Sequence, residues 1–186
     1  SRDPHRARDF ASRHGVPQIV ADPVALVHGD EVDAVVIALP PALQPDLAVA
    51  AFRAGKHVLC EKPLAVSLDE ALRIEAAWRA SGRVGMVNFC YRLVPEIRDF
   101  RARLLAGRCG RLSLVQVDWV LGSRLDRTLT HNWKAQDEMG AGTLQAFGAH
   151  VFDYLFHDLQ GTRILAARRG TLFPLRPDGA GGERAA

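Results

Sequence analysis

Two short groups of residues in this chain carry side chains suited to acid–base chemistry. The first is Glu61-Lys62-Pro63, directly after the apolar run His57–Cys60, and the second is His150, followed by Asp153. An ordinary lysine has a pKa of about 10.4, which desolvation or a positive neighbour lowers. A histidine titrates near pH 6.5 and exchanges protons at neutral pH. Lys62 and His150 are therefore the candidate proton-handling residues, with a surface lysine and a purely structural helix histidine as the alternatives.

Lys62 is positioned by a strand-helix-strand unit. The apolar stretch Asp33–Leu39 and the stretch His57–Cys60 flank a helix expected from about Leu43 to Ala54, which ends at Gly55. This order predicts two parallel strands whose carboxyl ends face one crevice, where open α/β sheets bind ligands. Pro63 is a candidate cis proline that directs the lysine side chain.

The remaining pattern predicts an α/β unit followed by an α+β unit. Ser67 and Glu70 form a capping box for a helix over 68–80. We predict a partial Rossmann domain, a doubly wound parallel sheet, at residues 1–87, and part of an α+β substrate and oligomerisation domain at 88–186. The other expected helices are 4–14, one after Asp22-Pro23, 95–106 and 142–159, and the other expected strands are 18–20, 84–89, 112–120, 164–172 and 172–175.

Composition excludes several classes of protein. The chain is 48% hydrophobic and 24% charged, which is ordinary for a globular protein. Its net charge of +3 comes mainly from arginines interspersed with aspartates, so we predict no nucleic-acid partner. Three cysteines without C-x-x-C spacing favour reduced thiols and a cytoplasmic location. No apolar run approaches the roughly 18 to 20 residues of a membrane span.

The order of the motifs resembles one family of oxidoreductases. Leu39-Pro40, Glu61-Lys62-Pro63, Asn88 to Arg92 and Gly148-x-His150 occur in the order typical of the Gfo/Idh/MocA family, which includes glucose-fructose oxidoreductase and inositol 2-dehydrogenase. The resemblance covers nearly the whole chain. It implies an NAD(P)-dependent oxidoreductase that transfers a hydride between the cofactor and a secondary alcohol of a sugar or cyclitol. It also implies a homo-oligomer.

The resemblance assigns catalytic roles to the two candidate residues. Lys62 would lie beside the nicotinamide and the reacting carbon, where it orients the substrate hydroxyl and shares its proton, and His150 would accept that proton. The family has an aspartate four residues before the histidine, but this chain has Ala146 there. The missing carboxylate leaves open a non-catalytic paralogue that binds a sugar or cofactor. A metal site built from His150, Asp153 and His157 is less favoured, and we predict no metal.

The resemblance also assigns binding residues. Leu39, Pro40, Glu61, Lys62 and Arg92 would line the cofactor site, together with Gln44 in place of the usual histidine. Ser1 and Arg2 fall where the adenosine ribose is read, and the arginine there favours NADP slightly over NAD. The substrate would contact Lys62, Arg92, Trp133 and His150.

The glycine-rich turn that binds a dinucleotide pyrophosphate is absent from these residues. No G-x-G-x-x-G occurs in the sequence, which starts at Ser1 as if at the end of a strand. We therefore expect a segment truncated at both ends, and an inactive fragment is the third functional possibility.

Overall fold

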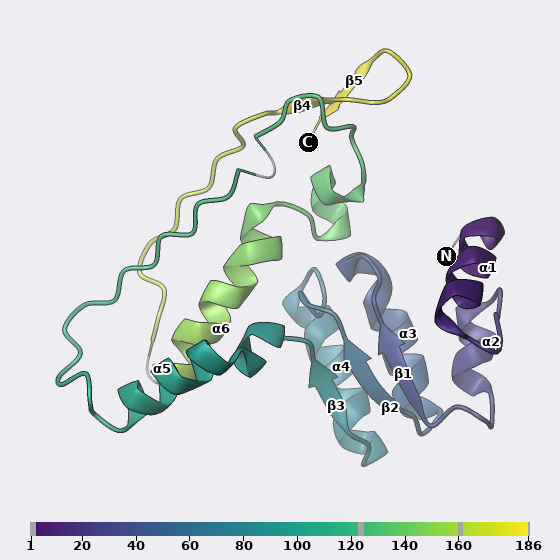
Figure 1. Cartoon of the computed structure of the whole chain (residues 1–186), viewed down its shortest axis with the longest axis horizontal. Coiled ribbons are helices and arrows are strands. Elements are labelled where there is room, and N and C mark those ends of the chain that lie inside the picture. The colour runs from purple at the N-terminus through teal and green to yellow at the C-terminus, as the bar shows by residue number, and fades with distance from the viewer. Residues whose placement is uncertain (1–2, 123–124, 160–161, 186) are drawn as a thin grey trace.

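A parallel sheet forms the centre of the chain. The computed structural model describes residues 3–122, 125–159 and 162–185. The sheet contains β1 (Ala34–Ile37), β2 (His57–Cys60) and β3 (Gly85–Val87), hydrogen-bonded in that order. Ala34 lies opposite His57 and Ile37 opposite Cys60, so β1 and β2 end at the same edge (Figure 1). This geometry confirms the α/β class and the expected parallel pairing.

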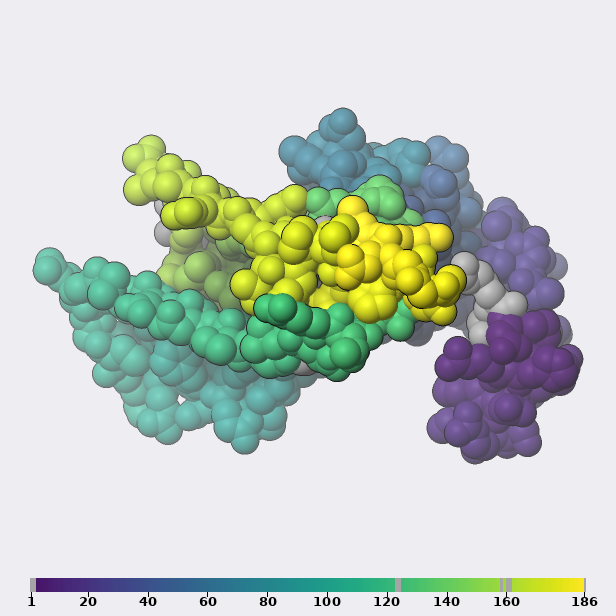
Figure 2. All heavy atoms as spheres, turned by 90° about the horizontal axis from the view of Figure 1, so that it is seen from above, coloured from purple at the N-terminus to yellow at the C-terminus, as the bar shows by residue number. Residues whose placement is uncertain are grey.

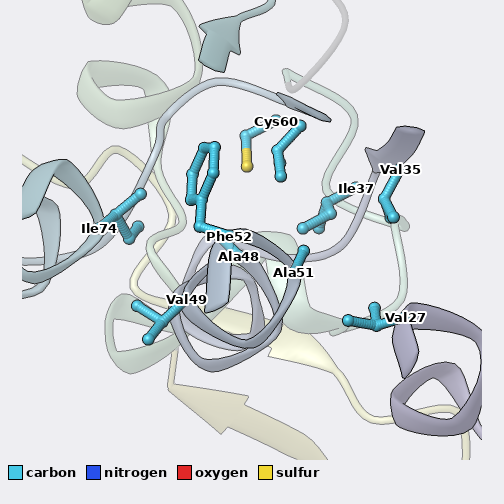
Figure 3. Packing of buried hydrophobic residues seen from close by; sticks show 10 residues of the cluster. Val27, Val35, Ile37, Ala48, Val49, Ala51, Phe52, Cys60 and Ile74 are labelled. Atoms are coloured by element: carbon cyan, nitrogen blue, oxygen red, sulfur yellow. The ribbon is translucent and has the colours of Figure 1, made fainter. Parts of the chain in front are cut away.

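Helices α3 (Gln44–Arg53) and α4 (Leu68–Ser81) cover one face of the sheet and enclose the core. Phe52 of α3 lies beside Cys60 of β2, and Ile74 of α4 belongs to the same buried cluster (Figure 3). Each such side chain stabilises the fold by about 1.5–3 kcal/mol when fully buried. Burial also raises the pKa of the Cys60 thiol to about 11, so this cysteine stays neutral.

Side-chain caps start three of the helices where the sequence predicts them. Asp3 accepts hydrogen bonds at the start of α1 (Pro4–His14), and Asp22 does so at α2 (Pro23–His28). Ser67 Oγ accepts from the Glu70 amide at the start of α4, 3.2 Å away. These caps satisfy backbone N–H groups that have no partner inside the helix. Only Ala11 of α1 is buried, and Figure 2 shows this helix projecting from the body.

The second half of the chain contains few regular elements. After β3 come a 3₁₀ turn (Cys90–Leu93) and helix α5 (Pro95–Leu105). A π-helical turn (Leu144–Gly148) leads into helix α6 (Ala149–Asp158), which lies beside α5 in Figure 1. The remaining elements are the 3₁₀ turns Pro41–Leu43, Trp133–Ala135 and Asp137–Met139, and an antiparallel hairpin of β4 (Leu175–Pro177) and β5 (Glu183–Ala185).

Three of the expected strands do not form. Residues 18–20, 112–120 and 164–172 have no strand structure, and β4 begins only at the end of the expected strand 172–175. Each segment is rich in β-forming residues, but a strand also needs a neighbour that completes its hydrogen-bond ladder. In the described parts of the chain these segments pair with no strand, and their apolar side chains stay exposed, as Leu114 and Leu165 do at 80% and 81%. The predicted boundary between residues 87 and 88 stays a prediction.

The two halves meet through a glycine. Gly140 has a φ of +75° and is packed so closely that an added Cβ would lie 2.6 Å from Val66 Cγ1 and 2.7 Å from Pro41 Cβ. Pro41 follows β1 and Val66 follows β2, so the contact is at the carboxyl edge of the sheet. Only a residue without a side chain allows this approach.

Gly140→Ala should therefore weaken the packing between the halves, and Gly142→Ala is its matched control. Both positions have a left-handed φ, which costs an alanine about 1 kcal/mol, but Gly142 has open space around it. We expect Gly140→Ala to lower the free energy of unfolding by about 1–3 kcal/mol more than Gly142→Ala does. Urea denaturation of both variants measures this difference, and equal losses would contradict the packing role.

Candidate functional site

The turn that carries Lys62 is fixed on both sides by hydrogen bonds. The Glu61 amide donates to the Ile37 carbonyl at 2.9 Å, which ties the end of β2 to the end of β1. The Glu61 carboxylate accepts from Asn88 Nδ2 at 2.7 Å and from the Lys62 amide at 3.2 Å. The Lys62–Pro63 peptide bond is cis, as expected. The direction in which Lys62 leaves the sheet is thus set by three neighbouring strand ends.

Gln44 lies beneath this turn and is completely buried. Its Nε2 lies within hydrogen-bond distance of three backbone carbonyl oxygens, those of Glu61 (3.0 Å), Pro63 (2.7 Å) and Leu64 (3.3 Å). Its Oε1 is buried without a hydrogen-bond partner in the described residues. Gln44 therefore contacts the backbone of the turn, and its predicted contact with a cofactor stays a prediction.

Lys62 joins the two halves of the chain. Its Nζ donates to the Ala146 carbonyl oxygen at 2.6 Å, across 84 positions of sequence. Ala146 lies in the π-helical turn, and His150 follows one helical turn later in α6. Such π-helical turns are rare and often occur at functional sites. The fold therefore brings together the two residues that the sequence identifies as acid–base candidates.

His150 is buried among aromatic rings. Only 5% of its surface is exposed, and its ring lies 4.5 Å from Tyr91 and 6.1 Å from Trp119, which is stacked on it. Burial lowers the pKa of His150 below its usual 6.5, and the positive charge of Lys62 lowers it further. The carboxylates of Asp153 and Glu61 act in the opposite direction but do not prevail. The imidazole is therefore neutral at pH 7 and can accept a proton.

Arg92 pairs with Asp153 on α6. Its Nε donates to both carboxylate oxygens of Asp153, at 3.1 and 2.9 Å, and a second guanidinium nitrogen donates to Oδ1. The Asp153 side chain is only 5% exposed, so the pair is partly desolvated. This ion pair joins the 3₁₀ turn after β3 to α6, so Arg92 has a structural role. Direct contact of Arg92 with a cofactor or substrate stays a prediction.

The other predicted site residues are dispersed. Leu39 and Pro40 follow β1 at the same edge as Lys62, and Leu39 is 37% exposed. Trp133 lies in a 3₁₀ turn, where the Lys134 ammonium lies 5.7 Å from the centre of its ring. Ser1 and Arg2, predicted to read the adenosine ribose, lie outside the described residues.

Three aromatic residues beside His150 were not among the predicted site residues. Phe89 and Tyr91 come from the crossover after β3, with Tyr91 in the 3₁₀ turn Cys90–Leu93, and Trp119 comes from the extended segment 112–120. The signal for Tyr91 is its place next to Arg92, beyond the carboxyl end of a strand. For Trp119 the sequence favours a packing role, since an aromatic residue in an alternating apolar segment usually packs.

A cavity of about 380 Å³ lies between α5 and α6, next to the Arg92–Asp153 pair. Its lining includes Arg98, Arg101 and His157, but neither Lys62 nor His150. It therefore lies apart from the acid–base pair.

No group of three or more His, Cys, Asp or Glu side chains placed to hold a metal ion occurs among residues 3–122, 125–159 and 162–185. No helix in the same ranges has the length and apolar character of a membrane span.

Comparisons with known proteins place this geometry in a family. The family described as "Oxidoreductase family, NAD-binding Rossmann fold" matches residues 1–89. An uncharacterized oxidoreductase of Synechocystis sp. is 35% identical over 177 residues, which are 95% of this chain and 48% of that protein. The chain thus spans about half the length of the curated relatives that it matches.

Solved structures agree over the whole chain. An oxidoreductase domain protein from Kribbella flavida superimposes with a TM-score of 0.90 at 32% identity, covering 100% of this chain and 50% of that one. A levoglucosan dehydrogenase in complex with NADH and L-sorbose gives a TM-score of 0.88 at 27% identity, with the same coverage. With the order of its motifs and its parallel sheet, this chain belongs to the Gfo/Idh/MocA family of oxidoreductases with a Rossmann fold.

Proposed function

We propose that the protein is an NAD-dependent oxidoreductase acting on a secondary alcohol of a sugar or cyclitol. The observation that carries this proposal is the meeting of Lys62 and His150, from two halves of the chain, at the carboxyl edge of the sheet. A dehydrogenase needs a proton acceptor and a hydrogen-bond donor beside one substrate hydroxyl. The related levoglucosan dehydrogenase, solved with NADH and L-sorbose, supports the same substrate class.

The residues at this edge fit the nicotinamide end of a dinucleotide. Leu39 offers an exposed apolar surface after β1, and the turn at Glu61 and Lys62 supplies polar groups after β2. When bound, NAD would accept a hydride from the substrate carbon as the substrate is oxidised. We propose NAD over NADP because the family description and the related dehydrogenase name NAD and NADH. The lean toward NADP rested on Arg2, outside the described residues, and finds no support in these relatives.

The chain's own residues supply the proton chemistry. The Lys62 ammonium donates to the Ala146 carbonyl, one helical turn before His150. The same charged group would donate to the substrate oxygen and favour loss of its proton. Neutral His150 would take that proton as the C–H bond breaks, so the alcohol becomes a ketone and the imidazole becomes imidazolium. The aromatic rings around His150 keep water away from the imidazole.

Lys62→Ala in the whole protein should remove this proton chemistry, with Arg79→Ala, which also removes one positive charge, as the control. Loss of a positioned acid–base group lowers turnover by about 10²–10⁴-fold. Arg79 is an exposed residue of α4 paired with Glu75 and belongs to no predicted site, so its removal should leave turnover nearly unchanged. Steady-state reduction of NAD with a panel of sugars and cyclitols measures both. Unchanged turnover in Lys62→Ala would refute the proposed role.

The pH profile tests His150. Because the base must be neutral and its pKa is lowered, kcat/KM for alcohol oxidation should fall only below pH 6.5. His150→Asn should lose this acidic limb together with most of the activity. His28→Asn, at the exposed end of α2, should keep the wild-type profile. An acidic limb with its midpoint above 6.5, or one that persists in His150→Asn, would show that another group is the base.

A second candidate function is a paralogue that binds a sugar or cofactor without turnover. It is favoured by Ala146, whose side chain gives Lys62 and His150 no carboxylate. Ala146→Asp distinguishes the two functions, with Ala149→Asp, one residue before His150, as a control for added charge. If the native protein is such a non-catalytic paralogue, ligands should stabilise the wild type without NAD reduction, and Ala146→Asp should create turnover. Clear turnover in the wild type would exclude the paralogue.

Homo-oligomerisation and a cytoplasmic location stay predictions.

A further inference from the structure

We propose that Gln44 is a positioning residue. It fixes the turn that carries Lys62, so that the Lys62 ammonium reaches the Ala146 carbonyl next to His150. This inference rests on the proposed function only for its kinetic consequence. Its structural part, the dependence of the Lys62 position on Gln44, stands on hydrogen bonds within the chain. The role differs from the predicted contact of Gln44 with a cofactor, because Gln44 would act here through the backbone of the turn.

The contacts of Gln44 are on both sides of Lys62. Its Nε2 reaches the carbonyl of Glu61, the residue before Lys62, and those of Pro63 and Leu64, the residues after it. All three distances are 3.3 Å or less. A single buried amide group therefore holds the turn at both ends, and Lys62 projects from the middle of the segment that it holds.

These carbonyls need a side-chain donor at this place. Buried carbonyl groups without a partner cost about 1–3 kcal/mol each. Within the turn, Pro63 has no N–H and the Lys62 amide already donates to the Glu61 carboxylate, so neither of these residues supplies a donor. Gln44 begins α3, directly beneath the turn, and its side chain is 0% exposed. Water therefore does not reach Nε2, and no water competes with it for the three carbonyls.

The unpartnered Oε1 shows which contacts set the orientation of the amide. Gln44 leaves this buried acceptor without a partner in the described part of the chain and turns Nε2 toward the carbonyls. The reverse orientation would point an oxygen at three carbonyl oxygens, which repel it. The turn, more than the environment of Oε1, thus dictates how Gln44 lies, as expected for a residue selected to hold the turn.

The position of Lys62 follows from this arrangement. Its Nζ donates to the Ala146 carbonyl at 2.6 Å, and the turn sets the point from which this side chain starts. A misplacement of about 1 Å in a catalytic group costs about 10²-fold in rate. The hydrogen bonds of Gln44 Nε2 go to the three backbone carbonyls, and its Oε1 has no partner in the described structure, so its effect on rate would pass through the turn.

The test uses Gln44→Met in the whole protein, which keeps the length of the side chain but removes both donors. Gln44→His retains a ring N–H and is the rescue variant, and Gln18→Met, at an exposed position, is the matched control. Two readouts are measured. The first is kcat and KM for NAD-dependent alcohol oxidation. The second is labelling of lysines by an amine-reactive ester, followed by peptide mass spectrometry.

The labelling reports the position of Lys62 without any reference to activity. The chain has only three lysines. Lys134 is exposed, and Lys56 is buried with its Nζ on the Gly29 carbonyl, so both serve as internal standards. Gln44→Met should release Lys62 from Ala146 and raise its labelling relative to Lys134. Labelling of Lys56 relative to Lys134 should not change.

In Gln44→Met we expect kcat to fall by about 10²-fold, with the KM for NAD changed much less, and we expect Gln44→His to restore most of the rate. If Lys62→Ala is harmless, the proposed function fails, but the labelling still decides the role of Gln44. Folded Gln44→Met with wild-type labelling of Lys62 would overturn the proposal. If Gln44→Met does not fold, Gln44→Asn, which withdraws the amide by one methylene, must show the raised labelling, and wild-type labelling there would overturn it equally.

Discussion

The parallel register of β1 and β2 is the constraint on which the rest of the site depends. Because Ile37 pairs with Cys60, the two strands end together, and the segments that follow them leave the sheet side by side. A shift of one residue in either strand would turn the buried side chains of that strand to the opposite face. The core between the strands and α3 therefore fixes the register, and the register fixes where Lys62 starts.

A series of hydrogen bonds at that edge joins both halves of the molecule. Asn88 donates to the Glu61 carboxylate, and the Lys62 amide donates to the same carboxylate. The Lys62 ammonium donates to the π-helical turn before α6. On the far side of His150, Arg92 holds α6 through Asp153. Buried polar groups of this kind are costly unless each has a partner, so the position of one limits the positions of the others. The acid–base pair is thereby placed by its neighbours as well as by its own packing.

The sequence predicted the elements whose signals are local. The caps at Asp3, Asp22 and Ser67 and the strands that end before Pro40 and Glu61 all lie where their own residues put them. The expected strands at 112–120 and 164–172 do not form. A strand needs a neighbouring strand that completes its hydrogen bonds, and the β propensity of its own residues does not provide one. Likewise, Gln44 could be assigned by resemblance to the cofactor loop, but only coordinates show its amide beneath the turn. Hydrogen bonds between residues distant in sequence leave no periodic signal.

Alanine at position 146, where the resemblance to the family implies an aspartate, has an electrostatic consequence for the base. A carboxylate at this position would neutralise part of the charge of Lys62 and raise the pKa of His150. A backbone carbonyl binds the same ammonium without carrying a charge, so the field of Lys62 acts on the imidazole and lowers its pKa. The π-helical turn makes this possible, since it directs the Ala146 carbonyl toward Lys62. Compared with an aspartate, alanine at position 146 thus makes His150 a weaker base that is neutral over a wider range of pH. A lone histidine needs to be neutral to accept a proton, because no carboxylate shares that proton.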